Sequence, residues 1–429
     1  MKRGYKKSEE MLARALKTIP LGTQTFSKSR TQYPLGVSPF YAAKARGSKI
    51  WDVDGNRYID FVCALGSVSL GYNDPDVVSA VKKQLSLGTI FTLPCPLEVY
   101  VAEAMRDMIP CADMVRFGKN GSDATAGAVR VARAYTGRDY VAVCGYHGWQ
   151  DWYIGSTPRN LGVPESTRKM TLKFAYNDPE SLASLFKRHS GKIACVVMEA
   201  MNFEWPAPGF LREVKRLCRE NGALFVMDEM VTGFRYSNGG AQEFFKVKPD
   251  LATFGKGMAN GYPISAVVGR RDVMKLMEEC FFSFTFGGEA LSLAASLATM
   301  AKYRERPVVE TMKKNGARIL GHVKALIEEH DMGDVLEISG HPAWTILSIK
   351  DTPKYGSWTI KTLYLQEMMK RGIITLGAHE TTYAHSDRDI DALLDAYSEV
   401  VPIIKKGVRE NRLAGMLGCR PLKPLFKVR

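Results

Sequence analysis

Hydrophobic and polar positions alternate along the middle of the chain in the order expected of an α/β protein. Short apolar runs have the length and composition of buried strands at 140–144, 193–198, 223–228, 251–254 and 264–268. Segments with helical spacing accompany them at 122–136, 180–188 and 210–221. This order predicts a doubly wound sheet in which polar or catalytic residues follow the strands.

The two ends of the chain show a different pattern. Residues 8–18 predict a short amphipathic helix, and the segment KIWDVDGNRYIDFV predicts a β-hairpin with Asp54 and Gly55 in its turn. A further helix is expected at 75–86. Residues 290–330 have a helical pattern, and residues 331–402 mix strand-like with helix-like runs. We therefore expect a long helical connector that leads into a C-terminal subdomain.

The net positive charge of the chain is concentrated at its two ends. The chain has 429 residues, 45% of them hydrophobic, and a formal net charge of +14. Residues 1–30 contribute +6 and residues 403–429 contribute +7, so the part between them is nearly neutral. Such basic tails are either solvated, draped over a neighbouring subunit, or attractive to an anionic substrate or surface. No interleaving of basic and aromatic residues predicts nucleic-acid binding.

The sequence lacks the patterns of membrane insertion and of a metal centre. No apolar run reaches the roughly 18 residues of a spanning helix, and the basic start is followed by no apolar signal-peptide core. The eight cysteines are scattered and form no C-x-x-C pair or His/Cys cluster. We expect a cytoplasmic enzyme with reduced thiols, no metal and no membrane-inserted segment.

The segment from Leu224 to Gly257 carries the most informative chemistry. Asp228 ends one apolar run and Lys256 follows the next, so both should lie at the carboxyl ends of buried strands, where open α/β sheets build their sites. Pyridoxal phosphate requires such a pair. A lysine amine holds its aldehyde as a Schiff base, and a carboxylate keeps its pyridine nitrogen protonated. Taken alone, a lysine in FGKG is more often a surface residue of a turn.

Two other segments extend this pattern. Residues 120–123 precede an alanine-rich helix and would offer backbone N–H groups and the Ser122 hydroxyl to a phosphate, with simple helix capping as the alternative. After the next strand, Tyr146 in GYHG would place an aromatic ring against a planar cofactor, and a tyrosine of the core is the alternative. It is the order of these segments, more than any one of them, that indicates the cofactor.

The same order resembles the class III pyridoxal-phosphate-dependent aminotransferases, and among them the glutamate-1-semialdehyde 2,1-aminomutase branch. The matching segments span nearly the whole chain: WDVDGNRYIDF, GKNGSDAT, AVCGYHGWQD, MDEMVTGFR, TFGKGMANGYPISAVVG, FTFGGEALSLAAS and YAHSDRDID. The resemblance implies fold type I of these enzymes, the aspartate aminotransferase-like α/β fold, with a mainly parallel sheet. It assigns 63–318 to a large cofactor-binding domain, and 1–62 and 319–429 to a smaller α+β domain formed by the two termini.

The resemblance also implies roles around the cofactor ring. Lys256 would form the Schiff base, and Asp228 would pair with the pyridine nitrogen. Tyr146 would stack on one face of the ring, and Met230 would fill the place of the residue that packs on the other face. Glu199 falls on a family glutamate, although its usual proline neighbour is an alanine here.

The phosphate site, by the same resemblance, is shared between subunits. Gly121, Ser122 and Asp123 would belong to the part that holds the phosphate within one chain. Thr285 would reach the phosphate of the other subunit's cofactor. A site of this kind implies an obligate homodimer.

The sequence departs from the aminomutase pattern where substrate would bind. The N-terminal loop reads PLGTQTFSK, which puts Lys28 where the branch has an arginine that grips the substrate carboxylate; Arg30 could compensate. Lysine cannot make the planar bidentate contact of arginine. The loop after Tyr146 looks shorter than in the aminomutases, and the C-terminal LGAHETTYAHSD looks compressed. In it, His379 and Glu380 are either substrate contacts or plain loop residues.

Three readings of the activity follow. The first is transfer of an amino group from a donor to an aldehyde or ketone acceptor, such as a sugar- or polyol-like compound, by a ping-pong mechanism. The second is glutamate-1-semialdehyde 2,1-aminomutase of tetrapyrrole synthesis. The third is another reaction of the cofactor, such as racemisation or decarboxylation, or a non-catalytic binding protein, because a fold alone does not fix a reaction.

Overall fold

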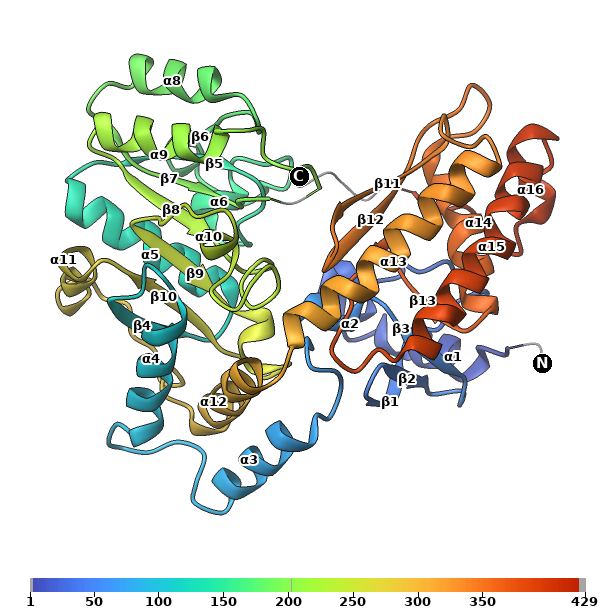
Figure 1. The fold of residues 1–429 in the computed structure, drawn as a ribbon, viewed down its shortest axis with the longest axis horizontal. Helices are drawn as coiled ribbons and strands as arrows, with labels where there is room; N and C mark the ends of the chain where they lie inside the picture. The colour runs from blue at the N-terminus through green and yellow to red at the C-terminus, as the bar shows by residue number, and fades with distance from the viewer. Residues whose placement is uncertain (1–2, 202, 424–429) are drawn as a thin grey trace. The chain divides into compact units, whose positions relative to one another are not determined.

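The computed structural model describes residues 3–201 and 203–423 and divides them into two compact units (Figure 1). The unit that we call the large unit comprises residues 66–68 and 75–309, and the one that we call the terminal unit comprises residues 3–65, 69–74 and 310–423. These borders differ from the predicted boundaries at 62 and 318, because 63–65, 69–74 and 310–318 belong to the terminal unit. Hydrogen bonds explain the difference: Tyr72 pairs with Gly47, and Asn315 donates to the carbonyl of His385 at 3.1 Å.

A seven-stranded, mainly parallel sheet forms the centre of the large unit, in the order β4-β10-β9-β8-β7-β5-β6. The five predicted strands all form. The sequence did not indicate the two strands at its edges, β4 and β6, or that β10 runs antiparallel to both neighbours. The strand bounds are β4 Met114–Gly118, β5 Tyr140–Cys144, β6 Thr171–Lys173, β7 Ile193–Met198, β8 Leu224–Asp228, β9 Leu251–Phe254 and β10 Ser265–Gly269.

The predicted helices of the large unit also form, and α4 is one that the sequence did not indicate. The helical stretch expected from 290 onward is two helices, because the chain breaks at Arg306 and Pro307. The helices are α3 Pro75–Leu85, α4 Pro96–Met108, α5 Gly121–Thr136, α6 Asp151–Ile154, α7 Glu165–Lys169, α8 Pro179–Arg188, α9 Phe210–Glu220, α10 Ala241–Phe244, α11 Arg271–Met274 and α12 Ala290–Glu305, with 3-10 turns η3 Lys256–Ala259 and η4 Lys275–Glu278.

Helix α5 packs on the sheet through small side chains. Ala124, Ala128 and Ala132 are fully buried and meet valines and leucines of the central strands in one core cluster. Leu224 and Val226 belong to this cluster, so the α5 face of β8 carries its even-numbered residues. Because side chains alternate along a strand, Asp228 points to the same face as these two residues.

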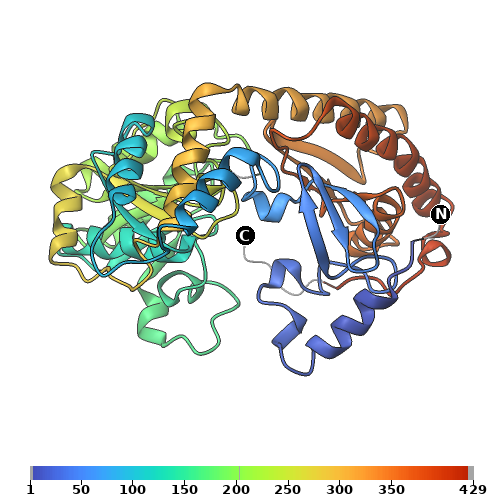
Figure 2. The same ribbon diagram turned by 90° about the horizontal axis from the view of Figure 1, so that it is seen from below.

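The terminal unit is built from both ends of the chain, and the blue and the orange-to-red segments lie side by side in Figure 2. The predicted hairpin is confirmed, since β2 and β3 pair antiparallel around Asp54 and Gly55, and β13 then joins β3 in parallel. The second sheet has the order β11-β12-β14. The elements are α1 Lys6–Ala15, η1 Pro20–Gly22, η2 Phe26–Lys28, β1 Ala42–Arg46, β2 Lys49–Asp52, β3 Arg57–Asp60, α2 Cys63–Gly66, α13 Val308–Glu329, β11 Leu336–His341, β12 Trp344–Ile349, α14 Ser357–Lys370, β13 Ile373–Ile374, β14 Ala378–His379, α15 Asp387–Arg409 and α16 Leu413–Met416.

Within the described ranges, no helix is long and apolar enough to cross a membrane. The same part of the chain contains no group of three His, Cys, Asp or Glu side chains placed to hold a metal ion, and its eight cysteines are free thiols.

Two buried histidines make the terminal unit sensitive to acid. Burial lowers the pKa of His379 to about 3 and that of His385 to about 4. Both titrate near 6.5 in an unfolded chain, so below about pH 6.5 the unfolded state takes up protons that the folded state does not. Their stabilising contribution is therefore complete above pH 6.5 and is lost as the pH falls toward 4 and then 3.

We predict that His379→Gln reduces the pH dependence of the free energy of unfolding. Between pH 6.5 and 4.5, wild type should lose up to about 1.4 kcal/mol per pH unit more than the variant, because the variant lacks one of the titrating groups. Urea unfolding at several pH values, followed by circular dichroism, measures both slopes. Parallel slopes for the two proteins would show that His379 does not titrate as described.

Candidate active site

The two residues singled out from the sequence lie at the ends of two neighbouring parallel strands. Asp228 is the last residue of β8, is 2% exposed, and is paired in register with Thr253 of β9. Lys256 follows the end of β9 after Gly255 and begins the turn η3. Its φ of 44° is in the left-handed region, which strains a residue with a Cβ by about 1 kcal/mol. Both residues thus lie at the carboxyl edge of the sheet.

Hydrogen bonds from three directions fix the Asp228 carboxylate. The backbone N–H of Met230 donates to Oδ1 at 3.0 Å, and the Thr253 hydroxyl donates to the same oxygen at 3.3 Å. The other oxygen, Oδ2, is 2.8 Å from Nδ1 of His147. Because both groups are buried and already oriented, the carboxylate needs no rearrangement to receive a cationic partner.

His147 contacts Asp228, and sequence reasoning gave it no role. Its Nε2 is 3.1 Å from the carbonyl oxygen of Cys144, which can only accept, so Nε2 carries a proton. Its Nδ1 is 2.8 Å from Oδ2 of Asp228, so the ring connects that carboxylate with the backbone at the end of β5. His147 therefore holds the Asp228 carboxylate in place through Oδ2. The only sequence signal was its place beside Tyr146 in GYHG, at the end of a buried strand.

The first turn of α5 presents backbone N–H groups that could donate to an anion. Asn120 caps the helix, and the carboxylate of Asp123 accepts the backbone N–H groups of Lys119 at 3.0 Å and Asn120 at 2.9 Å. The N–H groups of Gly121 and Ser122 have no partner inside the helix. They point out of its N-terminus, which is the positive end of the helix dipole. The structure thus gives Asp123 the capping role, since a direct phosphate contact would bring two anions together.

Ser122 lies where its hydroxyl can donate to that anion. Its Oγ accepts the backbone N–H of Trp149 at 3.1 Å, which leaves the O–H free to donate in another direction. Gly148 makes this approach possible: its φ is +102°, and a Cβ at this position would overlap Ser122 Oγ. The turn after β5 and the start of α5 are therefore held together without a side chain in between.

Met230 connects the α5 turn with the lysine turn. A Cβ built on Gly121 would lie 2.9 Å from Sδ of Met230, and one built on Gly255 would lie 2.8 Å from the same atom. The start of α5 and the residue before Lys256 thus contact one side chain from two sides. Tyr146 is partly buried beside the same core cluster and makes an edge contact with Tyr153, with ring centroids 5.7 Å apart.

Glu199 supports the backbone of the aromatic turn. It follows β7, is 4% exposed, and its Oε2 accepts the backbone N–H of Tyr146 at 3.2 Å. A Cβ on Gly145 would lie 2.8 Å from the same oxygen. This contact orients Tyr146, and a direct contact of Glu199 with the cofactor stays a prediction.

Thr285, Lys28 and Arg30, also named from the sequence, are exposed. Thr285 lies in an exposed loop of the large unit. Lys28 and Arg30 are exposed residues of the terminal unit, and their assignment to substrate stays a prediction.

His379 and Glu380 are buried in the terminal unit. The Thr345 hydroxyl occupies one ring nitrogen of His379 and the Tyr397 hydroxyl the other, which favours a core role for this histidine. Glu380 is 9% exposed, and its backbone bonds to Phe61 and Cys63.

The groups of the large unit match pyridoxal phosphate part by part. The turn at Gly121 and Ser122 would hold the phosphate, and Asp228 would hold the pyridine nitrogen. Met230 lies against Gly121 and Gly255 at the margin of this space, and the amine of Lys256 would reach the aldehyde. The fit rests on the close approach at these two glycines, which leaves no room for a Cβ, and on the fixed carboxylate.

Comparisons with known proteins identify the family of the chain. The family model described as aminotransferase class-III matches residues 33–401. Glutamate-1-semialdehyde 2,1-aminomutase of Methanosarcina acetivorans is 33% identical, covering 89% of this chain and 98% of the relative. The 3-aminobutyryl-CoA aminotransferase of Cloacimonas acidaminovorans is 30% identical, covering 93% and 98%.

Solved structures show the same fold. The FumI protein of Sphingopyxis sp. MTA144, in its pyridoxal-phosphate internal aldimine form, superposes with a TM-score of 0.88 at 30% identity, over 97% of this chain and 99% of that one. An omega-transaminase of Sphaerobacter thermophilus superposes with a TM-score of 0.83 at 25% identity, over 93% and 98%. The chain therefore belongs to the class III aminotransferases, enzymes of fold type I that depend on pyridoxal phosphate.

Proposed function

We propose that the protein is a transaminase that moves an amino group from a donor to an aldehyde or ketone acceptor, such as a sugar- or polyol-like compound, in two half-reactions. The observation that carries this choice is Lys28, which replaces the arginine that the aminomutase branch uses for its substrate carboxylate. An exposed lysine is a flexible point charge and does not select a planar carboxylate as arginine does. A relative named as an aminotransferase, 30% identical over nearly its whole length, also supports the proposal.

The residues of the large unit would perform the chemistry in the following way. Pyridoxal phosphate, when bound, supplies an aldehyde that links to amines and a protonated ring that accepts electrons. The amine of Lys256 would yield its place to the donor's amine and then, a short distance away, move a proton at the substrate carbon. Asp228, backed by His147, would keep the pyridine nitrogen protonated. The N–H groups of the α5 turn would hold the phosphate in place.

The second candidate function is glutamate-1-semialdehyde 2,1-aminomutase. It is favoured by relatives of that name at 33% identity, which cover about nine-tenths of this chain. The two candidates differ in one respect that can be measured. A transaminase consumes a donor and releases its carbonyl product, whereas an aminomutase converts one compound into its isomer.

The spectrum of the bound cofactor separates the two. We expect an amino donor alone to shift the absorbance of the holoenzyme to that of the aminated cofactor. An acceptor carbonyl compound should then reverse the shift. Screening donors first and acceptors second identifies both substrates. Isomerisation of glutamate-1-semialdehyde at a high rate, with no donor consumed, would replace the transaminase proposal by the aminomutase.

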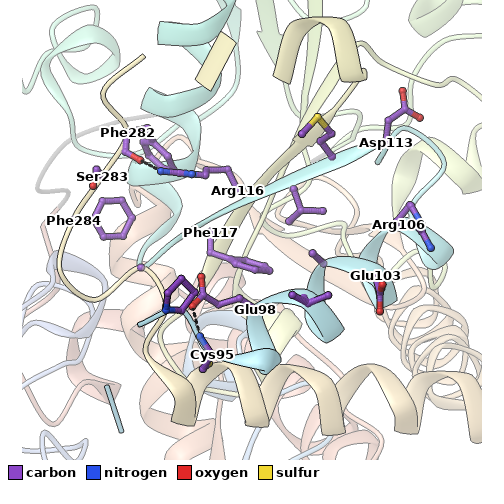
Figure 3. Close-up of a pocket in the computed structure, with 17 residues that line it drawn as sticks. Cys95, Glu98, Glu103, Arg106, Asp113, Arg116, Phe117, Phe282, Ser283 and Phe284 are labelled. Atoms are coloured by element: carbon purple, nitrogen blue, oxygen red, sulfur yellow. Dashed lines mark hydrogen bonds between the residues drawn. The ribbon is translucent and has the colours of Figure 1, made fainter. Parts of the chain in front are cut away.

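We also propose that two copies of the chain share their cofactor sites. Thr285 lies between Phe284 and Phe286, which are 37% and 56% exposed, and Phe281 is 77% exposed. The loop forms one wall of a cavity of about 550 Å³, with α4 as the opposite wall (Figure 3). Exposed aromatic side chains beside a cavity are typical of a surface that another protein covers. A second copy is the partner that would place Thr285 near a phosphate.

We predict that Thr285→Ala weakens cofactor binding about tenfold, because the phosphate loses one hydroxyl donor. Mixing subunits tests whether the donor acts across the interface. A heterodimer of Lys256→Ala and Thr285→Ala subunits would combine both defects in one site and leave the other intact, so its one active site should bind the cofactor with wild-type affinity. A tenfold weaker affinity of that site, in a heterodimer isolated with two affinity tags, would mean that Thr285 acts within its own chain.

A further inference from the structure

Lys119 joins two parts of the large unit that are far apart in sequence. Its Nζ is 2.9 Å from Oε2 of Glu289 and 3.3 Å from the hydroxyl of Ser292. The ion pair is mostly shielded, since the side chains of Lys119 and Glu289 are 20% and 17% exposed. Burial alone would raise the pKa of the Glu289 carboxyl, but hydrogen bonds from Ser292 and Lys119 hold that pKa below its usual value.

Each residue of this ion pair lies at the start of a helix. Lys119 immediately precedes Asn120, the cap of α5, and its own backbone N–H also donates to the Asp123 carboxylate at 3.0 Å. Glu289 caps α12 by accepting the N–H groups of Leu291 at 2.7 Å and Ser292 at 3.1 Å. The pair therefore connects the turn that would hold the phosphate with the residue that ends the Thr285 loop.

The Thr285 loop is held by contacts at both of its ends. Its residues 281–288 form no helix or strand. At its start, Arg116 and Arg130 donate to the carbonyl oxygens of Phe282 at 3.2 Å and Phe281 at 2.6 Å. Figure 3 shows Phe282, Ser283 and Phe284 along one side of the cavity. At its end, Lys119 holds Glu289 and the backbone N–H of Ala290 donates to the carbonyl oxygen of Thr89 at 2.8 Å, so the ion pair contributes to where the second half of the loop lies.

The charges argue against a role for Lys119 as a bare cation for the phosphate. Its ammonium lies near the positive ends of two helices, where a cation is disfavoured unless a carboxylate compensates it. Glu289 supplies that carboxylate and neutralises the pair. A site selected only for attraction to phosphate would omit Glu289. The geometry instead suits a fixed connection between the first turn of α5 and the end of the Thr285 loop.

We propose that the Lys119–Glu289 ion pair positions the Thr285 loop relative to the first turn of α5, and thereby sets the affinity for the phosphate group of the cofactor. The proposal rests on the proposed sharing of the cofactor site. Lys119 and Glu289 are positioning residues in it, because they act through Thr285 and the α5 turn.

Cofactor binding to the apoenzyme of the full chain tests this proposal. The variants are Lys119→Met, Glu289→Gln and the double variant; the glutamine keeps an oxygen for the α12 cap. We expect each single variant to bind pyridoxal phosphate about tenfold more weakly, and the double variant to be no weaker than either single one, since one connection is lost in all three. Affinity for pyridoxal, which has no phosphate, should stay within twofold of wild type in all of them.

Several results would overturn the proposal. Tighter binding of pyridoxal phosphate by Glu289→Gln would show that Lys119 acts as a charge. Equal losses for pyridoxal and pyridoxal phosphate, or losses that add in the double variant, would show general destabilisation or independent roles. Lys119→Arg, which keeps the ion pair, should retain wild-type affinity, and loss in this variant would also contradict the proposal.

A matched control removes a different ion pair from the same helix. Lys302, near the other end of α12, pairs with Asp76 at 2.8 Å. Lys302→Met should leave the ratio of the two affinities unchanged. If wild type itself failed to bind pyridoxal phosphate, the assignment of the cofactor site would fail. If it bound normally and every variant matched it, only the positioning role would fail.

Discussion

Lys256→Ala should remove the absorbance of the Schiff base between the cofactor and the protein and lower turnover by about 10⁴-fold or more. Two roles are lost together, because the lysine amine both attaches the cofactor and moves the proton at the substrate carbon. Pyridoxal phosphate should still bind through the α5 turn and Asp228, so equilibrium dialysis would detect it. The spectrum and the steady-state rate of the purified variant measure the two effects.

Lys246→Ala is the matched control for this change. Lys246 is exposed and, like Lys256, has a left-handed backbone, with a φ of 55°. The same substitution therefore alters the same kind of backbone position away from the strand ends. We expect normal colour and rate from it. Normal turnover in Lys256→Ala would remove the assignment of the catalytic lysine.

Asp228→Asn should retain the cofactor and lose about 10²- to 10³-fold in rate. An amide keeps the shape of the side chain and a hydrogen bond to the ring, but it does not hold a proton on the pyridine nitrogen. The ring then accepts electrons poorly. Single-turnover kinetics with an amino donor, compared with cofactor affinity, separates the loss of rate from any loss of binding.

Asp250→Asn provides the comparison at the opposite edge of the same sheet. Asp250 accepts the backbone N–H of Phe225 at 2.8 Å and pairs with Arg270 at 2.7 Å, so its loss affects stability alone. Its rate constant should equal that of wild type. An Asp228→Asn variant that turned over as fast as this control would show that the carboxylate does not control the pyridine nitrogen.

The strands of the central sheet could be predicted because each is an apolar run closed by polar residues. For β5, β7 and β9 even the bounds agree with the prediction. Asp228 and Lys256 were visible for the same reason, since each marks the end of such a run. The edge strand β4 could not be predicted, because its residues are only partly buried and give no continuous apolar signal. The antiparallel direction of β10 depends on its pairing with β4, which local periodicity does not record.

The contacts that complete the site depend on tertiary structure. His147 is 81 positions from Asp228, and Lys119 is 170 positions from Glu289, so neither pair produces a spacing that a sequence pattern can show. Asp123 was predicted beside the phosphate because capping and anion binding use the same residues, and only its hydrogen bonds show the capping role. His379 has the same ambiguity, which its two buried hydroxyl partners decide in favour of the core.

The attachment point of the cofactor tests the whole account most directly. Borohydride reduction of the purified enzyme, followed by proteolysis and mass spectrometry, fixes the cofactor to whichever lysine holds it. We predict that the added mass is found on the peptide that contains Lys256, and on no other peptide. A label on another lysine, or no label after saturation with pyridoxal phosphate, would contradict the account.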